Sequence, residues 1–152
     1  MSDPDVATLS ANIASAVIGQ GDLDQAVADL HRLPAGMPVR AKFAAGLVTA
    51  MMRSGKMPPP RLMRELDFLL ELADQDPPAD PQWPRHRIAA RVGGLMHASM
   101  EGTLGDPRTA LEQLAELERE AGGDPGLRPL FEAARMGLGF ARTVQDLSLI
   151  HI

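Results

Sequence analysis

A spaced pattern of small and apolar residues occurs twice in the chain and restricts its fold more than any other feature. Gly21-Asp22-x-x-x-Ala26-x-x-x-Leu30-x-x-Leu33 returns as Gly105-Asp106-x-x-x-Ala110-x-x-x-Leu114-x-x-Leu117. The offset is 84 residues, which equals two units of 42. Spacings of three and four residues place Ala and Leu on one face of a helix, and the preceding Asp is a preferred N-cap residue.

A second pattern marks another type of helix. Its three copies are Val39-Arg40-x-x-Phe43, Pro84-Arg85-x-x-Ile88 and Leu127-Arg128-x-x-Phe131, at offsets of 45 and 43 residues. A helix that starts near Pro60 lies between the two copies of the first pattern as a looser middle copy. Two alternating helix types with a period of 42 to 45 residues predict stacked antiparallel helix hairpins, that is, an all-α solenoid.

Proline and glycine divide the chain into about seven expected helices. Hydrophobic residues make up 45% of the chain, but only four Phe and one Trp are aromatic, so Ala, Leu, Val and Met must build the core. We expect the fourth helix to bury Leu62, Leu66, Leu69, Leu70 and Ala73. The expected helices span residues 5–19, 22–33, 38–54, 58–73, 84–101, 106–121 and 124–145, with a linker at 74–81.

Several short phrases resemble known repeat proteins. The stretch Gly-Asp-Leu-Asp-Gln-Ala-Val at residues 21–27 resembles the opening of a tetratricopeptide (TPR) repeat, although TPR units have only about 34 residues. Asp80-Pro81-x-Trp83-Pro84-Arg85 and Gly122-Gly123-Asp124-Pro125-Gly126-Leu127-Arg128-Pro129-Leu130 resemble the helical N-terminal regions of bacterial proteins that end in a caspase-like CHAT protease domain. The resemblance covers most of residues 20–145 and implies a TPR-like segment of a larger protein.

The composition changes at the end of the chain. Arg outnumbers Lys by 13 to 2 and Asn12 is the only Asn, as in proteins from GC-rich bacterial genomes. Three Ile occur in residues 1–146, yet Ile150 and Ile152 fall within the last three positions. Leu-Ser-Leu-Ile-His-Ile at 147–152 resembles the translated end of a common sequencing transposon. We therefore expect a truncated repeat segment at 1–146 and a non-native tail at 147–152, with a native apolar tail as the alternative.

No catalytic or cofactor-binding constellation is present in the sequence. There is no Cys, which excludes disulfides, zinc-thiolate sites and a cysteine nucleophile, so the CHAT protease activity does not carry over to this segment. Ser54-Gly55-Lys56 lacks the first Gly and the Ser/Thr of a P-loop, and neither HExxH nor GxSxG occurs. We predict a segment that is not an enzyme and takes no cofactor and no metal.

Charge and hydropathy restrict the classes of binding partner that we expect. The net charge of −5 disfavours binding to nucleic acid or to an anionic membrane. The longest apolar stretch, residues 44–52, is too short for a membrane span. The N-terminus carries Asp3 and Asp5 and lacks the basic region of a secretory signal, so the expected location is the cytoplasm. The expected partner is therefore another protein or a downstream domain of the same chain.

The sequence is compatible with three functions. The preferred one is a protein-interaction or regulatory scaffold within a larger bacterial protein. The second is a sensor or regulatory arm of a CHAT-type cysteine protease, and the third is a helical small-molecule sensor. The densest basic spot, Arg85, Arg87 and Arg91, is a candidate partner-binding site, with pairing to acids of the helix that ends at Asp74 as the alternative.

The last helix is expected to expose apolar surface. Solenoids need polar terminal helices, because an apolar outer face would otherwise meet water. The helix expected at 124–145 instead carries a broad apolar set, namely Leu130, Phe131, Met136, Leu138 and Phe140.

Overall fold

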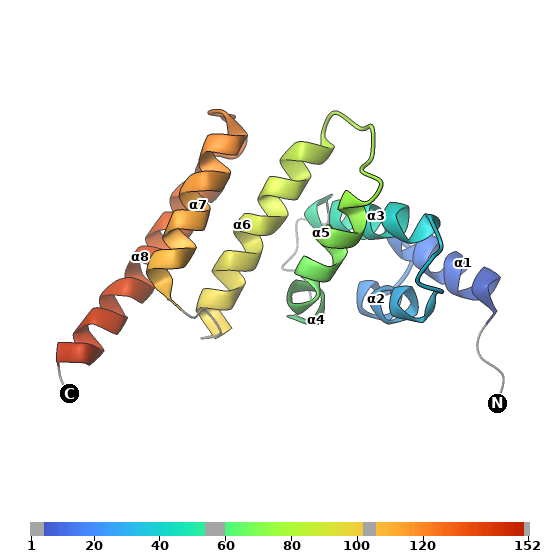
Figure 1. Cartoon of the computed structure of the whole chain (residues 1–152), viewed down its shortest axis with the longest axis horizontal. Coiled ribbons are helices and arrows are strands. Elements are labelled where there is room, and N and C mark those ends of the chain that lie inside the picture. Colours follow the sequence, from blue (N-terminus) through green and yellow to red (C-terminus); the bar gives the residue numbers. More distant parts are fainter. Residues whose placement is uncertain (1–4, 54–59, 102–105, 151–152) are drawn as a thin grey trace. The chain divides into compact units, whose positions relative to one another are not determined.

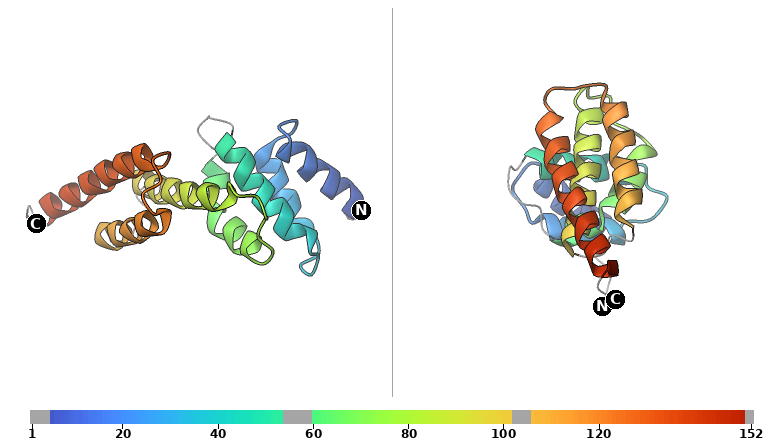
Figure 2. Two further views of the ribbon diagram at one scale, coloured as in Figure 1. Left: turned by 90° about the horizontal axis from the view of Figure 1, so that it is seen from above. Right: turned by 90° about the vertical axis from the view of Figure 1, so that its left-hand side faces the viewer.

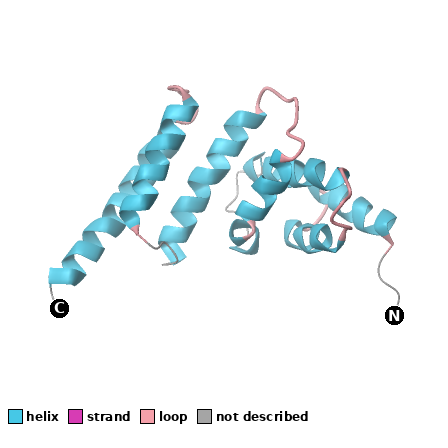
Figure 3. Cartoon of the chain, in the orientation of Figure 1, coloured by secondary structure: helices cyan, strands magenta, loops and turns pink. Residues whose placement is uncertain are grey.

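The computed structural model describes residues 5–53, 60–101 and 106–150, and within these ranges every regular element is a helix (Figure 1, Figure 3). The all-α prediction is therefore confirmed. The chain divides into two compact units, Met1–Arg87 and Ile88–Ile152. The helices are α1 (Val6–Val17), α2 (Leu23–Arg32), α3 (Val39–Arg53), α4 (Pro60–Arg64), α5 (Leu66–Asp74), α6 (Trp83–Glu101), α7 (Pro107–Ala121) and α8 (Arg128–Ile150).

The first unit is held together by α1, α2, α3 and α5. Helix α3 packs on α5 and on α1, and α2 packs on α1, α3 and α4. Close approach of α1 and α3 depends on Gly46, because a Cβ there would lie 3.0 Å from both methyl groups of Val17. The core is aliphatic, and its largest fully buried side chains include Ile13, Leu30, Leu47, Met51, Leu62, Leu69 and Leu70.

The fourth expected helix is interrupted. A turn at Glu65 separates α4 from α5, so the structure has one helix more than the seven expected in its described part. At this turn the Glu65 carboxylate lies 2.9 Å from Nε2 of His31. The His31 ring also stacks on Phe68, with 4.2 Å between ring centroids. The five apolar residues expected to face the core are all buried despite the break, namely Leu62, Leu66, Leu69, Leu70 and Ala73.

One acid is buried inside the first unit. Asp29 on α2 is 2% exposed, and its Oδ1 accepts a hydrogen bond of 3.0 Å from Nε2 of Gln25, one turn earlier. Its Oδ2 has no hydrogen-bond partner in the described part of the chain. Burying a carboxylate with only one partner costs stability, so the Gln25 bond matters more than an exposed helix pair does.

In the second unit, residues of α6, α7 and α8 form one apolar core. Helices α7 and α8 lie side by side and run antiparallel (Figure 1, Figure 2). Helix α6 contributes Ile88 and Val92 to their core. The predicted ends of α7 are confirmed, because Asp106 caps it, Pro107 follows at the first position and Gly122 ends it in the left-handed conformation (φ 63°). The remaining core residues are Ala110, Leu114, Leu117, Leu127, Phe131, Ala134 and Leu138.

The start of the last helix was predicted wrongly. The Asp124 carboxylate accepts a hydrogen bond from the Gly126 amide instead of capping a helix, and the Leu127 amide donates to the Asp124 carbonyl. These contacts form a turn, and α8 begins only at Arg128. Asp followed by Pro and Gly is turn chemistry, because Asp bonds its own backbone two residues on and Gly weakens a helix.

The two copies of the repeated pattern begin with the same local structure and differ at their ends, because Leu33 follows the last residue of α2 whereas Leu117 lies within α7. Asp22 and Asp106 each accept from the amide two residues later, at 2.9 Å. Ala26 and Ala110 are 1% and 2% exposed. The two Leu positions of each copy are buried as well, namely Leu30 and Leu33 in the first and Leu114 and Leu117 in the second.

We predict that Gln25→Ala lowers the free energy of unfolding by about 1 kcal/mol, because Asp29 then loses its one hydrogen-bonding side chain. Urea denaturation of the full chain measures the change. Gln113→Ala is the matched control, since Gln113 is an exposed glutamine on α7. Equal effects of the two substitutions would show that the Gln25–Asp29 bond adds nothing.

Candidate functional site

The outer face of α8 carries the largest exposed apolar side chains of the second unit. Met136 is 77% exposed, Phe140 71%, Val144 45% and Leu147 51%. Their spacing of four, four and three residues aligns them along one side of the helix. We call these four residues the α8 stripe. They confirm the prediction that the last helix exposes apolar surface.

The opposite face of α8 is also apolar. Phe131, Ala134 and Leu138 are buried in the core of the second unit, and Leu130 is partly buried against it. The sequence set named above is therefore split, with Phe131 and Leu138 inside and Met136 and Phe140 outside. A helix that is apolar on both sides is normally buried on both sides.

Polar contacts hold α8 against α7 and leave the stripe uncovered. Nη1 of Arg135 donates to both carboxylate oxygens of Glu118 on α7, at 2.9 and 2.8 Å. Further along α8, Nε of Arg142 lies 4.0 Å from Oδ2 of Asp146. Both arginines lie on the side of α8 away from Phe140, at about 100° per residue around the helix. The Arg135–Glu118 pair therefore holds α8 against α7, the Arg142–Asp146 pair lies within α8, and neither arginine covers Phe140.

The predicted basic spot lies on α6. Nε and Nη2 of Arg87 donate to the two carboxylate oxygens of Asp74 at 3.0 and 2.9 Å, so Arg87 pairs with the last residue of α5. Arg85 and Arg91 are exposed. The alternative given for the cluster, pairing with acids of the preceding helix, thus applies to Arg87. Binding of a partner by Arg85, Arg87 and Arg91 stays a prediction.

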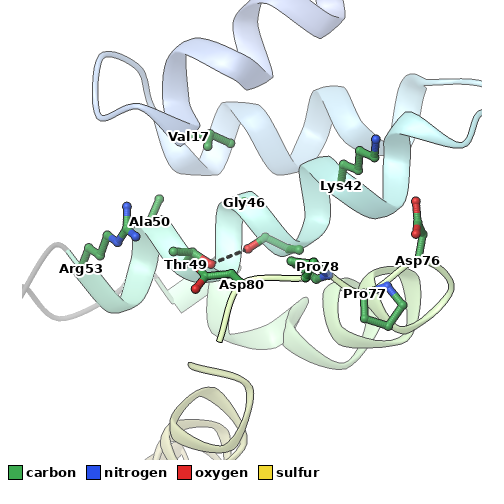
Figure 4. Close-up of a pocket in the computed structure, with 12 residues that line it drawn as sticks. Val17, Lys42, Gly46, Thr49, Ala50, Arg53, Asp76, Pro77, Pro78 and Asp80 are labelled. Carbon is green, nitrogen blue, oxygen red and sulfur yellow. Dashed lines mark hydrogen bonds between the residues drawn. The ribbon is translucent and has the colours of Figure 1, made fainter. Parts of the chain in front are cut away.

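Sequence reasoning did not find a pocket in the first unit. Its volume is about 640 Å³, and it lies between α3 and the loop that joins α5 to α6 (Figure 4). Figure 4 shows Lys42 and Asp76 toward one end of α3 and Arg53 toward the other. The remaining lining residues are Val17, Ala45, Gly46, Thr49, Ala50, Pro77, Pro78, Ala79 and Asp80.

The described side chains that line this pocket are mainly apolar and charged. They include two bases and two acids, and the one hydroxyl among them, on Thr49, donates to the Ala45 carbonyl at 2.9 Å. No histidine or cysteine is among these described lining residues. Asp80 is engaged locally, because its carboxylate accepts from the Gln82 amide at 2.9 Å.

Other site types find no support in the described residues. Among residues 5–53, 60–101 and 106–150, no group of three His, Cys, Asp or Glu side chains is placed to hold a metal ion. In the same ranges no helix combines the length and the apolar character that crossing a bilayer requires. No family model matches the chain, and neither a curated protein nor a solved structure does.

We predict that Arg87→Lys lowers the free energy of unfolding by up to about 1 kcal/mol, because lysine cannot form the two parallel bonds to Asp74. The loss should shrink in 1 M salt, which screens exposed charges. Arg91→Lys is the control, since Arg91 is exposed on the same helix. A salt-independent loss, or an equal loss in the control, would contradict this role of the ion pair.

Proposed function

We propose that this chain is a helical-repeat scaffold for protein–protein interaction within a larger bacterial protein of the cytoplasm. The two-sided apolar character of α8 is the observation that carries the proposal. Its inner face is buried and its outer face exposes Met136 and Phe140 at 77% and 71%. Exposed apolar patches of this kind mark surfaces that another protein element covers.

The repeated local structure supports a solenoid for this scaffold. Helices α2 and α7 share an N-capping Asp, a buried alanine at Ala26 and Ala110, and a buried leucine one turn later at Leu30 and Leu114. Units with matching capped and apolar faces stack by burying those faces against neighbours, and stacked hairpins offer extended binding surfaces. In that arrangement a neighbouring helix hairpin covers the α8 stripe.

The element that covers the stripe belongs to a separate protein or to another part of the same polypeptide. A CHAT-type protease domain that this segment restrains is the second form of the proposal. An in-frame caspase-like His and Cys in the gene beyond codon 146 would support that form. A short helical end would exclude it and leave the scaffold proposal intact.

We predict that the dilute protein binds a hydrophobic dye such as anilinonaphthalene sulfonate through the stripe. Met136→Ser together with Phe140→Ser should lower the dye fluorescence by about half, because these two side chains form most of the exposed apolar area. Circular dichroism should stay unchanged, since both side chains are exposed. Ile18→Ser is the control, because Ile18 is 70% exposed on the other unit. Dye fluorescence that stays unchanged in the double variant would refute the role of the stripe.

The α3 pocket favours a second candidate function, a small-molecule sensor. Its volume of about 640 Å³ lies in the range of ligand pockets, and its described lining combines apolar side chains with two acids and two bases. We predict that metabolite-like fragments carrying both a carboxylate and an amine raise the melting temperature. Ala50→Trp should abolish that rise by filling the pocket, whereas Ala115→Trp, at an exposed position on α7, should not. A fragment panel that leaves the melting temperature unchanged would remove this candidate.

A further inference from the structure

We propose that the α8 stripe is a dimer interface, at which α8 of one copy pairs in parallel with α8 of a second copy. This inference rests on the proposed function, because it names the partner of the same surface. Three properties of α8 carry it, namely the spacing of its exposed apolar residues, their area and the placement of its charges.

The exposed face of α8 has the spacing of a helix pair. Ala133, Met136, Phe140 and Thr143 follow one another at intervals of three, four and three residues, and all four are exposed. Leu147, the first residue of the tail expected to be non-native, continues this spacing four residues later and is exposed as well. Alternation of three and four is the heptad spacing that keeps one seam of a helix against a partner helix. Phe140 stands at the centre of this seam.

The area of the stripe fits a small stable interface. With the exposed fractions given above, its four side chains present roughly 500 Å² of apolar surface per copy. Complete burial of these side chains in two copies would cover up to about 1,000 Å², the lower limit for a specific interface. Gly137 and Gly139 flank Phe140, and a Cβ built on either meets no atom within 4 Å. A second backbone can therefore approach beside the Phe140 ring.

The charges of α8 select the direction of pairing. Glu132 and Asp146 lie on the same edge of the stripe, about 80° and 120° around the helix from Phe140, and Arg128 lies on this edge at the start of α8. Leu130, Gly137 and Ala141 lie on the other edge and carry no charge. Antiparallel pairing brings like edges together and sets Glu132 near Asp146 of the other copy. Parallel pairing sets the charged edge against the uncharged edge and avoids this repulsion.

The chain contains no cysteine, so a single introduced thiol reports the pairing without interference. In the parallel pair the two copies of residue 133 face each other within disulfide reach. In an antiparallel pair centred on Phe140 they lie about 20 Å apart. Ala133→Cys, oxidised with glutathione disulfide, should therefore yield a covalent dimer on a non-reducing gel. Ile18→Cys, which exposes a thiol on the other unit, should not.

Sedimentation equilibrium of the full chain gives the second measurement. We expect a dimer whose dissociation constant rises at least tenfold in Phe140→Ser, while Ile18→Ser leaves it unchanged. A dimer in which Ala133→Cys does not cross-link would overturn the parallel arrangement. A monomer that still binds dye through the stripe would overturn dimerisation but leave the scaffold proposal standing. A monomer whose dye binding ignores the stripe would overturn both.

Discussion

Close contact between helices through small residues is the constraint on which this structure depends. With few aromatic side chains, the core cannot fill wide gaps between helices, so their backbones must approach one another. Gly46 permits this approach between α1 and α3, because any side chain there would press on Val17. Ala26 and Ala110 are almost fully buried at matching positions of α2 and α7. Leucines one and two turns away then supply most of the buried apolar volume.

This constraint explains which parts of the fold the sequence predicts. The caps at Asp22 and Asp106 and the end of α7 at Gly122 depend on backbone chemistry within a few residues, and all three were predicted. The turn at Asp124 was not predicted although its signal is local. Asp-Pro occurs both at helix starts and in turns, and here Gly126 favours the turn. The break at Glu65 was missed for another reason. Its His31 contact lies 34 residues away along the chain, beyond the reach of local patterns.

The candidate sites divide in the same way. An apolar excess on the last helix can be counted in the sequence, so the exposure of Met136 and Phe140 was foreseen. Which face of α8 turns inward depends on α6 and α7, so the burial of Phe131 and Leu138 was not. The α3 pocket forms only when a proline-containing loop returns to a helix some 30 residues earlier, and no pattern in either segment indicates it. The sequence indicates the basic residues of α6, but only the folded chain shows that Arg87 pairs with Asp74.

Helices α1 and α8 differ in the apolar area that their exposed faces present. The exposed residues within α1 are mostly small or polar, such as Ala7, Thr8, Ala11 and Asn12, so covering them would release little free energy. Complete burial of a fully exposed large apolar side chain is worth about 1.5–3 kcal/mol, and the stripe residues, which are 45–77% exposed, would gain the corresponding part of it. Glu132 and Asp146 stand on one edge of the stripe, so the centre of the outer face of α8 stays apolar. The α8 stripe therefore has the composition of an interior surface, and its charges restrict which helix can cover it and in which direction.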